Sequence, residues 1–465
     1  MPNKQAYLNI LNSALSTGGD YAEIYIEEKV SQGVSIENGK VDASTIANTY
    51  GAGIRILQGV NSVYGYTNDV SSKGLIELAK SLSNSFSGKQ VLKIKTLKTK
   101  HIKNNHPAKE PLSEVSVEDK INFIRPGEQA LREYDKRIVR TKAAFMNSKT
   151  KVTIVNSNGL IIHDEKERGR FILSAIASDG EKFEQAFEGP GAMAGFEHFK
   201  KNVDVVKLAK NAAKAAINML AARDCPSGKM TVVIGNGNGG VIFHEACGHS
   251  LEATSVSKNL SVFSNKLGTQ IASKIVSAVD DGTIANSWGS NNIDDEGNKT
   301  EKVVLIENGI LKNYLVDKVG GRRMNMRPNG CGRRESYKYE PTSRMSNTYI
   351  CPGESTPEEI IQATKLGLYA KTLSGGSVNP STGEFNFGVM EAYIIRDGKI
   401  CEPVRGASLI GSGSDVLMNI DMVGNDCERS NGMCGSVSGF IPVDIGQPTI
   451  RVQNILVGGN GGELK

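Results

Sequence analysis

The chain has 465 residues, of which 39% are hydrophobic and 23% are charged, and its formal net charge at pH 7 is +5. This length is sufficient for two or more domains with sizeable cores, and the composition is that of a globular protein. The lysine-rich segment 93–109 contains neither arginine nor an aromatic residue, so it lacks the pattern of a nucleic-acid site. We therefore expect no nucleic-acid partner.

The sequence also argues against a membrane partner and against disulfide bonds. No stretch approaches the ~18 to 20 consecutive apolar residues of a membrane-spanning helix, and the N-terminal segment has the pattern of an amphipathic helix. The seven cysteines are odd in number and irregularly spaced, which is untypical of a disulfide framework and indicates a reducing compartment. We therefore expect a cytoplasmic protein.

Strand and helix patterns alternate in the first half of the chain. Alternating apolar and polar residues predict short strands between residues 21 and 70, and Asn38-Gly39 is a hairpin-turn dipeptide between two of them. Helical spacing of apolar residues predicts further elements, although Pro126 should break or kink one helix. The predicted helices cover residues 71–86 and 203–223 and lie within 117–134, and further strands cover 138–146, 152–155, 160–163 and 171–177.

The second half is dominated by strand patterns joined by tight turns. Asn308-Gly309 and Asp397-Gly398 each separate two alternating runs, which favours an antiparallel or barrel-like sheet. Helices are predicted only over residues 267–277 and 357–368, the second with a capping box of Ser355 and Glu358. We therefore predict an α+β fold. An N-terminal α/β domain with mixed sheets covers residues 1–223, and a β-rich C-terminal domain that carries a metal-binding helix covers residues 224–465.

The most informative motif follows a short apolar strand, residues 231–234. His244, Glu245 and His249 form the pattern HExxxH, and two imidazoles beside a carboxylate are typical of a metal hydrolase. On a regular helix, residues five apart diverge by roughly 140°, so the two histidines can share one ion only if the helix deforms. Gly248 is the residue best able to allow a kink or a one-residue bulge.

The glycines before this motif also fit a second pattern. Gly235, Gly237 and Gly240 satisfy GxGxxG after a strand, which is the fingerprint of a dinucleotide site. The fingerprint also requires an acidic residue about 20 positions further on to hold the ribose, and none stands at the right place. We therefore interpret the glycines as a tight turn beside which an extended substrate passes close to the backbone.

The segment HEACGHSLE, after a strand and a glycine-rich turn, resembles the TldD/PmbA family of metalloproteases on its TldD-like side, which contains HExxxH. The resemblance continues in order through nearly all of the C-terminal half. The matching blocks are SVFSNKLG (261–268), VDDGT (279–283), IDDEG (293–297), VLIENGILKNYLVDK (304–318), GRRES (332–336), SNTYI (346–350), ASLIGSG (407–413) and the region from MCGSVSG through VDIGQPTIRV (433–452).

The resemblance implies a zinc-dependent metallopeptidase that hydrolyses peptides or unfolded polypeptides. His244, His249 and Cys434 would hold one zinc ion per chain, and Glu245 would activate the zinc-bound water as general base. It also implies a dimer around an internal chamber, formed with an identical chain or with a paralogous subunit. An extended substrate could bind by strand addition to a sheet edge. The alternative is a non-catalytic peptide-binding subunit of a TldD/PmbA-type complex.

Other chemically interesting residues are interpreted as structural. Cys247 lies within the motif but should project from a different face, and Cys427 occupies an expected apolar position. Glu252 follows His249 by three residues and could orient its imidazole as a hydrogen-bond acceptor. The charge runs 294–296 and 333–335 have the pattern of solvated turns, although their position in the matching blocks favours a place in the cleft for some of them; no individual role is assigned.

Overall fold

The alternating pattern of the first half produces one sheet of unusually long strands. It is seen in the computed structural model, which describes residues 2–379 and 381–464. β1 (Tyr21–Glu37) and β2 (Lys40–Gln58) form a hairpin whose turn residues, Asn38 and Gly39, both have positive φ, as the dipeptide predicts. β5 (Ile138–Asn156) and β6 (Leu160–Ser178) form a second long hairpin.

These long strands correct the prediction of four shorter ones. The polar residues 147–151 showed no apolar face, and a break was therefore predicted there. In the structure this segment remains a strand because it is hydrogen-bonded on both sides, with Lys149 opposite Val30 of β1 and opposite Glu167 of β6. The pairing partners, which lie far away in the sequence, supply what the local pattern lacks.

The first sheet is mixed, as predicted. Its strand order is β3-β2-β1-β5-β6-β4, β7 and β8 also pair with β6, and the pairing of β4 with β6 is parallel whereas the others are antiparallel. The remaining strands are β3 (Asn61–Thr67), β4 (Lys98–Lys100), β7 (Phe183–Glu188) and β8 (Gly191–Ala192).

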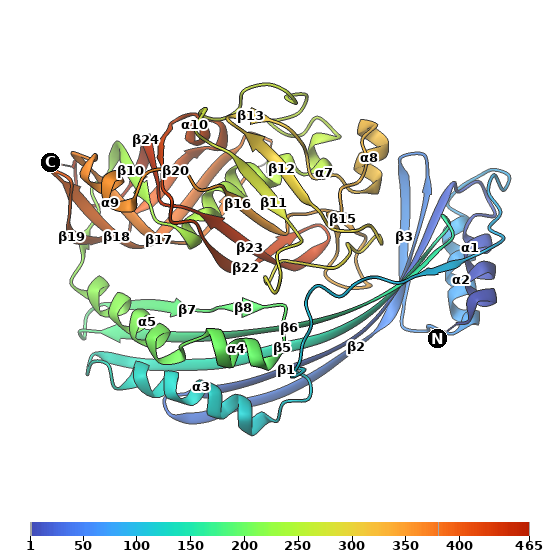
Figure 1. Ribbon diagram of the computed structural model, residues 1–465, viewed down its shortest axis with the longest axis horizontal. Helices are drawn as coiled ribbons and strands as arrows, with labels where there is room; N and C mark the ends of the chain where they lie inside the picture. Colours follow the sequence, from blue (N-terminus) through green and yellow to red (C-terminus); the bar gives the residue numbers. More distant parts are fainter. Residues whose placement is uncertain (1, 380, 465) are drawn as a thin grey trace.

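Helices cover one face of this sheet in two groups (Figure 1). The first group packs on residues such as Ile24 and Ile56, and the second packs on Phe145 and Phe171. The helices are α1 (Lys4–Ala14), α2 (Ser72–Ser83), α3 (Val117–Arg132), α4 (Phe196–Asn202) and α5 (Val205–Leu220). Of the two outcomes predicted for Pro126, a break does not occur, because α3 continues through it to Arg132. Pro126 lies on the exposed side of the helix, where water can satisfy the carbonyl that loses its partner.

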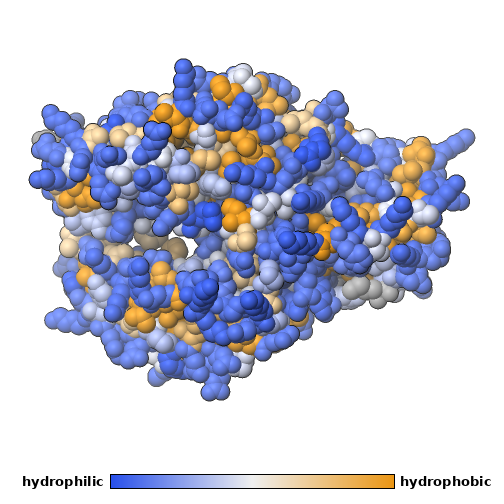
Figure 2. Space-filling view, viewed as in Figure 1, coloured by the Kyte–Doolittle hydropathy of each residue, from blue (hydrophilic) through white to orange (hydrophobic). Residues whose placement is uncertain are grey.

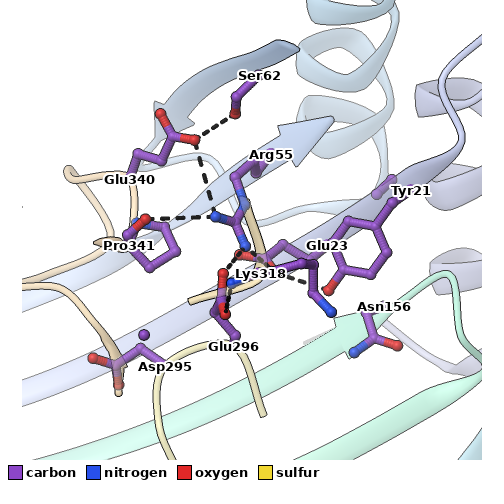
Figure 3. Close-up of polar contacts among 12 residues, drawn as sticks. Tyr21, Glu23, Arg55, Ser62, Asn156, Asp295, Glu296, Lys318, Glu340 and Pro341 are labelled. Atoms are coloured by element: carbon purple, nitrogen blue, oxygen red, sulfur yellow. Dashed lines mark hydrogen bonds and ion pairs between the residues drawn. The ribbon is translucent and has the colours of Figure 1, made fainter. Parts of the chain in front are cut away.

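The other face of the long strands packs against the C-terminal half. Tyr25, Ile154 and Ile162 share a cluster with Ile293 and Tyr337. A network of buried ion pairs lies beside this cluster (Figure 3). Figure 2 shows the surface hollowed between the upper, C-terminal body and the lower, N-terminal sheet.

The ion-pair network corrects the interpretation of two charge runs as solvated turns. Arg55 Nη2 lies 2.9 Å from Glu23 Oε2 and 2.5 Å from Glu296 Oε1, and the three side chains are at most 1% exposed. Arg334 Nη2 lies 2.8 Å from the other oxygen of Glu23. Asp294, Asp295, Glu296, Arg333 and Arg334 are all buried. The pattern of a solvated turn fails here because Asp295, Glu296 and Arg334 have their ion-pair partners in the other half of the chain.

The second half contains a closed ring of strands. Its order is β17-β10-β24-β20-β18, and β18 pairs back onto β17, so the predicted barrel-like core is confirmed. β19 and β9 extend from β18, and β21 pairs with β24. The strands are β9 (Arg223–Asp224), β10 (Gly228–Ile234), β17 (Leu366–Val378), β18 (Glu384–Arg396), β19 (Lys399–Arg405), β20 (Ser408–Ser412), β21 (Ile420–Val423) and β24 (Ile450–Gly458).

A six-stranded sheet packs beside this ring in the order β13-β12-β11-β16-β23-β22, and β14 and β15 form a separate pair. The strands are β11 (Ala278–Asp281), β12 (Lys302–Glu307), β13 (Ile310–Leu311), β14 (Gly332–Arg333), β15 (Thr342–Ser343), β16 (Asn347–Ile350), β22 (Glu428–Ser436) and β23 (Gly439–Gln447). The short helices are α7 (Ala253–Val256), α8 (Lys318–Met324), α9 (Pro357–Gln362) and α10 (Gly413–Met418). The predicted α+β class is confirmed; the domain boundary between residues 223 and 224 stays a prediction.

Two predicted helices in this half are wrong in whole or in part. Residues 267–277 form turns rather than a helix, and Gly268 has a φ of +77° that no helix contains. Residues 357–368 divide between α9, which ends at Gln362, and β17. The capping box consists of Thr356 and Glu359, one residue later than predicted. In the described part of the chain, no helix is long and apolar enough to cross a membrane.

Candidate metal centre

The HExxxH motif begins where a buried strand ends. β10 is hydrogen-bonded between β17 and β24, and its residues Val232, Val233 and Ile234 are fully buried, which fixes the start of the following segment. Four consecutive helical segments then carry the motif. They are η1 (Gly237–Gly240, a 3-10 turn), α6 (Val241–Phe243), η2 (His244–Gly248, a π-helical turn) and η3 (His249–Leu251, a 3-10 turn).

The π-helical turn brings both histidines to the same side. The N–H of His249 donates to the carbonyl of His244, five residues earlier, so the two residues lie one above the other. Their ring centroids are 5.2 Å apart. The deformation that the spacing requires is therefore present. A Cβ added to Gly248 would lie 2.1 Å from Met345 Sδ. A residue with a side chain at this position would therefore clash with Met345, and glycine allows the close contact.

Cys434 approaches the two imidazoles from β22. It pairs with Ile441 in the β22–β23 hairpin, and its Sγ lies 3.3 Å from His244 Nε2 and 3.2 Å from His249 Nε2. His244 and Cys434 are buried, at 2% and 5% exposure. The structure thus joins two residues of the motif to a cysteine that follows His249 by 185 positions.

The spacing of these atoms fits a zinc ion. The three candidate ligand atoms lie within 4.8 Å of one another. Tetrahedral zinc with ordinary Zn–N and Zn–S bonds separates an imidazole nitrogen from a thiolate sulfur by about 3.6 Å. Both observed nitrogen–sulfur distances are close to this value. Two imidazoles and a thiolate supply three ligands and leave a fourth position for water or substrate.

The electrostatics favour the ligand form of the cysteine. Burial alone would raise the pKa of Cys434, but the charge of His244 and the hydrogen bonds with both imidazoles outweigh burial and lower the pKa to about 3. Burial lowers the pKa of His249, whereas Glu252 and Cys434 raise it, and the resulting pKa is well above the ordinary value. The thiolate is the form of cysteine that binds metals.

Two carboxylates flank His249. The Oε2 of Glu245 lies 3.6 Å from His249 Nε2, on the side of the candidate ligand atoms, and its side chain is 24% exposed. Glu252 Oε2 accepts a hydrogen bond from His249 Nδ1 at 3.1 Å, which is the contact anticipated from the sequence. A partly exposed carboxylate therefore stands beside the candidate ligand atoms, and a buried acceptor stands behind His249.

The other candidate features lie outside this cluster. Cys247 is fully buried in the main hydrophobic core of the C-terminal half, and Cys427 Sγ contacts the carbonyl of Ile350 at 3.6 Å. All seven cysteines are free. A Cβ at Gly235 or Gly240 would lie 2.4 Å from backbone atoms of Lys371 or Gly446. The space beside these glycines is therefore filled by the protein itself, not by an extended substrate or a dinucleotide.

Sequence reasoning missed one residue of this centre. Arg344 has no exposed side-chain surface, and its guanidinium donates to the carbonyl of Cys434. It stands in a polar stretch between β15 and β16, where no motif or periodicity marks it. Only the contact across 90 residues reveals it.

Family models match three successive parts of the chain. A family model described as the PmbA/TldA metallopeptidase C-terminal domain matches residues 227–459. The central domain of that metallopeptidase family matches residues 110–220, and its domain 1 matches residues 22–85.

The similar proteins cover between 55% and 98% of the chain. A protein named metalloprotease TldD homolog, from Buchnera aphidicola subsp. Schizaphis graminum, is 35% identical over 98% of this chain and 96% of its own length. A protein of Saccharolobus solfataricus named zinc metalloprotease TldD homolog is 31% identical over 55% of this chain and 57% of its own length. The crystal structure of TldE from Thermococcus kodakarensis has a TM-score of 0.79 and covers 98% of this chain and 100% of its own, at 19% identity. It shares the fold.

Proposed function

Because the chain belongs to the PmbA/TldD family of metallopeptidases, we propose that it is a zinc-dependent peptidase. His244, His249 and Cys434 hold one zinc ion per chain in this proposal, and Glu245 is the general base. The observation that carries the proposal is the convergence of the three ligand atoms within 4.8 Å, with the Glu245 carboxylate beside them.

The roles of the residues follow from their positions. When bound, zinc supplies a water of lowered pKa and a positive charge for the carbonyl oxygen of a peptide bond. Glu245 would act as the general base: its carboxylate would accept a proton from the attacking water and would return that proton to the amide nitrogen of the peptide bond, which would then leave as an amine. Its position 3.6 Å from a ligand atom and its 24% exposure suit a base that must reach both zinc and solvent. Glu252 holds His249 with Nε2 toward the metal.

The substrate in this proposal is a peptide or an unfolded polypeptide. Strand addition would let main-chain hydrogen bonds hold an extended chain with little sequence selectivity. The edge of β22 beside Cys434 is poorly suited to it, because the carbonyls of Gly432 and Cys434 already accept hydrogen bonds from Trp288 and Arg344. We therefore place the extended substrate at another edge, and the hollow between the two halves gives it access (Figure 2).

We further propose that the protein acts as a dimer in the cytoplasm. The free state of all seven cysteines supports a reducing compartment. The likeness in fold to TldE supports a partner of the same architecture, either an identical chain or a paralogous subunit. Mixing the purified protein with such a paralogue and measuring the mass of the complex by light scattering tests this part of the proposal.

The proposed activity is tested with zinc-loaded wild-type protein and the Glu245→Gln variant. Each is incubated with a reduced, unfolded polypeptide and with a mixture of short peptides, and the products are read by mass spectrometry. We expect cleavage by the wild type and a loss of at least about 100-fold in the variant, because general-base catalysis contributes about 10²–10⁴-fold. Glu354→Gln, at an exposed loop position, is the matched control and should cleave normally.

Two results would contradict the proposal. Equal cleavage by wild type and Glu245→Gln would remove Glu245 from the reaction. Tight binding of peptides by a zinc-loaded wild type that cleaves none of them would instead support the alternative, a non-catalytic peptide-binding subunit.

A further inference from the structure

A buried arginine connects the strand of Cys434 to the rest of the candidate metal centre. Arg344 Nη2 donates to the carbonyl of Cys434 at 2.6 Å. Its Nη1 donates to Ser438 Oγ and to the carbonyl of Gly439, each at 2.9 Å. One guanidinium therefore binds both strands of the β22–β23 hairpin and the turn between them.

Several side chains of this hairpin are largely exposed. Met433, Val437 and Phe440 are 48%, 75% and 63% exposed, so their side chains do little to fix the position of the hairpin. Cys434 itself packs in a small cluster with Ile441 and Val443. Glu335 and Thr342 also bind the turn end of the hairpin, through Phe440 N–H and Ser438 Oγ, and Arg333 donates to the carbonyl of Pro442. Arg344 differs from these residues because it donates to the carbonyl of Cys434 itself.

The same arginine faces the second ligand through Glu252. Glu252 is 3% exposed, and its Oε2 accepts a hydrogen bond from His249. Within the described residues, its Oε1 has no hydrogen-bond partner, and neither has Arg344 Nε. These two atoms lie 3.9 Å apart. The positive charge of the guanidinium therefore stands directly behind the carboxylate that orients His249.

A buried guanidinium is costly to keep unless its charge and its donors are used. We propose that Arg344 is a positioning residue for the metal centre. It sets the position of Cys434 through the hairpin backbone, and it sets the orientation of His249 by keeping Glu252 in place as an anionic acceptor. This inference rests on the proposed function, because it concerns ligands of the proposed zinc ion.

Loss of Arg344 should lower the affinity of the centre for its metal, and not only the rate of catalysis. An imidazole that donates its Nδ1–H to a carboxylate presents a more basic Nε2 to the metal, and loss of such outer partners typically weakens metal binding by about 10–100-fold. Arg344 supports two of the three ligands. Its removal should therefore enlarge the volume that the ligand atoms explore and weaken the metal–sulfur bond in particular.

The test uses the full chain with Arg344→Met and Arg344→Lys. Zinc dissociation constants are measured by competition with a chelating dye, and the cobalt-substituted proteins are examined by absorption spectroscopy. We expect the zinc dissociation constant of Arg344→Met to rise by about 10–100-fold, with a shifted or weakened sulfur-to-cobalt charge-transfer band. Arg344→Lys keeps the charge but not the planar fork of donors, so its effect should be smaller.

Arg333→Lys is the matched control. Arg333 is also buried and donates to the carbonyls of Met345 and Pro442, but not to a ligand residue. This variant should keep the zinc affinity and the cobalt spectrum of the wild type. Glu252→Gln provides an independent variant that loses the negative charge without emptying the site, and it should also weaken zinc binding.

The outcomes separate this inference from the proposed function. A wild-type protein that binds no zinc would refute the proposed function, and the inference with it. A wild type that binds zinc, together with a folded Arg344→Met variant of equal affinity and unchanged cobalt spectrum, would overturn only the inference. An equal loss in Arg333→Lys would overturn it too, because the effect would then be general destabilisation. If Arg344→Met does not fold, the same criteria apply to Arg344→Lys and Glu252→Gln.

Discussion

Two buried polar clusters of the protein differ in the kinds of groups that they bring together. The network between the halves alternates in sign, with Arg55 and Arg334 set against Glu23 and Glu296 at hydrogen-bond distances. The metal centre instead brings together groups that all offer electron pairs, two imidazole nitrogens and a cysteine sulfur. The first cluster is complete in itself, whereas the function proposed for the second requires a bound cation.

This difference teaches how the two clusters contribute to the molecule. Buried ions that are paired and hydrogen-bonded fix geometry, and the removal of one partner leaves an uncompensated charge. The network therefore holds the N-terminal sheet against the C-terminal half. In the candidate metal centre, a π-helical turn and a hairpin bring the potential ligand atoms together, and metal binding as proposed would stabilise this arrangement.

The largest effect is expected when the network loses its central cation. Arg55→Met leaves Glu23 and Glu296 without their shared partner in a fully buried position. We expect the free energy of unfolding to fall by about 3–5 kcal/mol, as measured by urea denaturation. The exposed Arg327 pairs with Glu301 at 2.7 Å, and Arg327→Met is the control, which should cost about 1 kcal/mol or less. Equal losses in both variants would contradict the comparison.

His106, a buried imidazole elsewhere in the chain, sharpens the contrast with the two histidines of the candidate metal centre. His106 is 4% exposed, and its Nδ1 accepts a hydrogen bond from Asn286 N–H. Burial, aided by the charge of Arg168, lowers the pKa of His106 from 6.5 to about 4. The unfolded chain therefore binds a proton before the folded chain does, so the stability contributed above pH 6.5 is lost as the pH falls toward 4.

The expected loss from this histidine is up to about 3 kcal/mol between these two pH values. Urea denaturation of the zinc-free protein at a series of pH values measures it. His106→Gln retains an acceptor but cannot titrate, so its stability should fall less than that of the wild type over the same range. Parallel pH dependence in the two proteins would show that His106 does not contribute.

A smaller effect on stability is expected when a methyl group is added at Gly248 in the π-helical turn. In Gly248→Ala, the new methyl group would lie 2.1 Å from Met345 Sδ, so either the turn or Met345 must move. We expect a loss of about 1–3 kcal/mol in stability and a lower zinc affinity. Gly375→Ala is the control, because nothing lies within 4 Å of the added atom. Unchanged zinc affinity in Gly248→Ala would contradict the role assigned to this turn.

The sequence predicts local features of the metal centre better than long-range ones. The pair His244 and His249 required a deformed helix, and the structure has the π-helical turn at that place. Cys434 could not be assigned from spacing, because a ligand on another strand carries no periodic relation to the motif. Cys434 was assigned as a ligand only through the resemblance to the TldD/PmbA family. Arg344 had no signal of either kind.

The fold shows the same difference between local features, which the sequence predicts, and long-range features, which it does not. Asn38-Gly39 specifies its hairpin through local backbone preference, and the apolar run of β10 specifies a buried strand. Glu296 looked like part of a solvated turn because its partner Arg55 lies 241 positions away. Residues 267–277 have helical spacing, but they form a series of turns. Ile271, Ala272 and Val276 reach the core from these turns rather than from one face of a helix. Tertiary packing decided these segments.

The measurement that tests the account most directly is the zinc content of the wild type beside Cys434→Ser. Both are purified without chelators and without a metal-binding tag, and the metal is counted by mass spectrometry. The account predicts about one zinc per chain in the wild type, as in a site with three protein ligands, and a sharp loss in the variant. Cys427→Ser is the control and should retain zinc. Absence of metal from the wild type even after zinc is supplied, or full zinc in Cys434→Ser, would contradict the account.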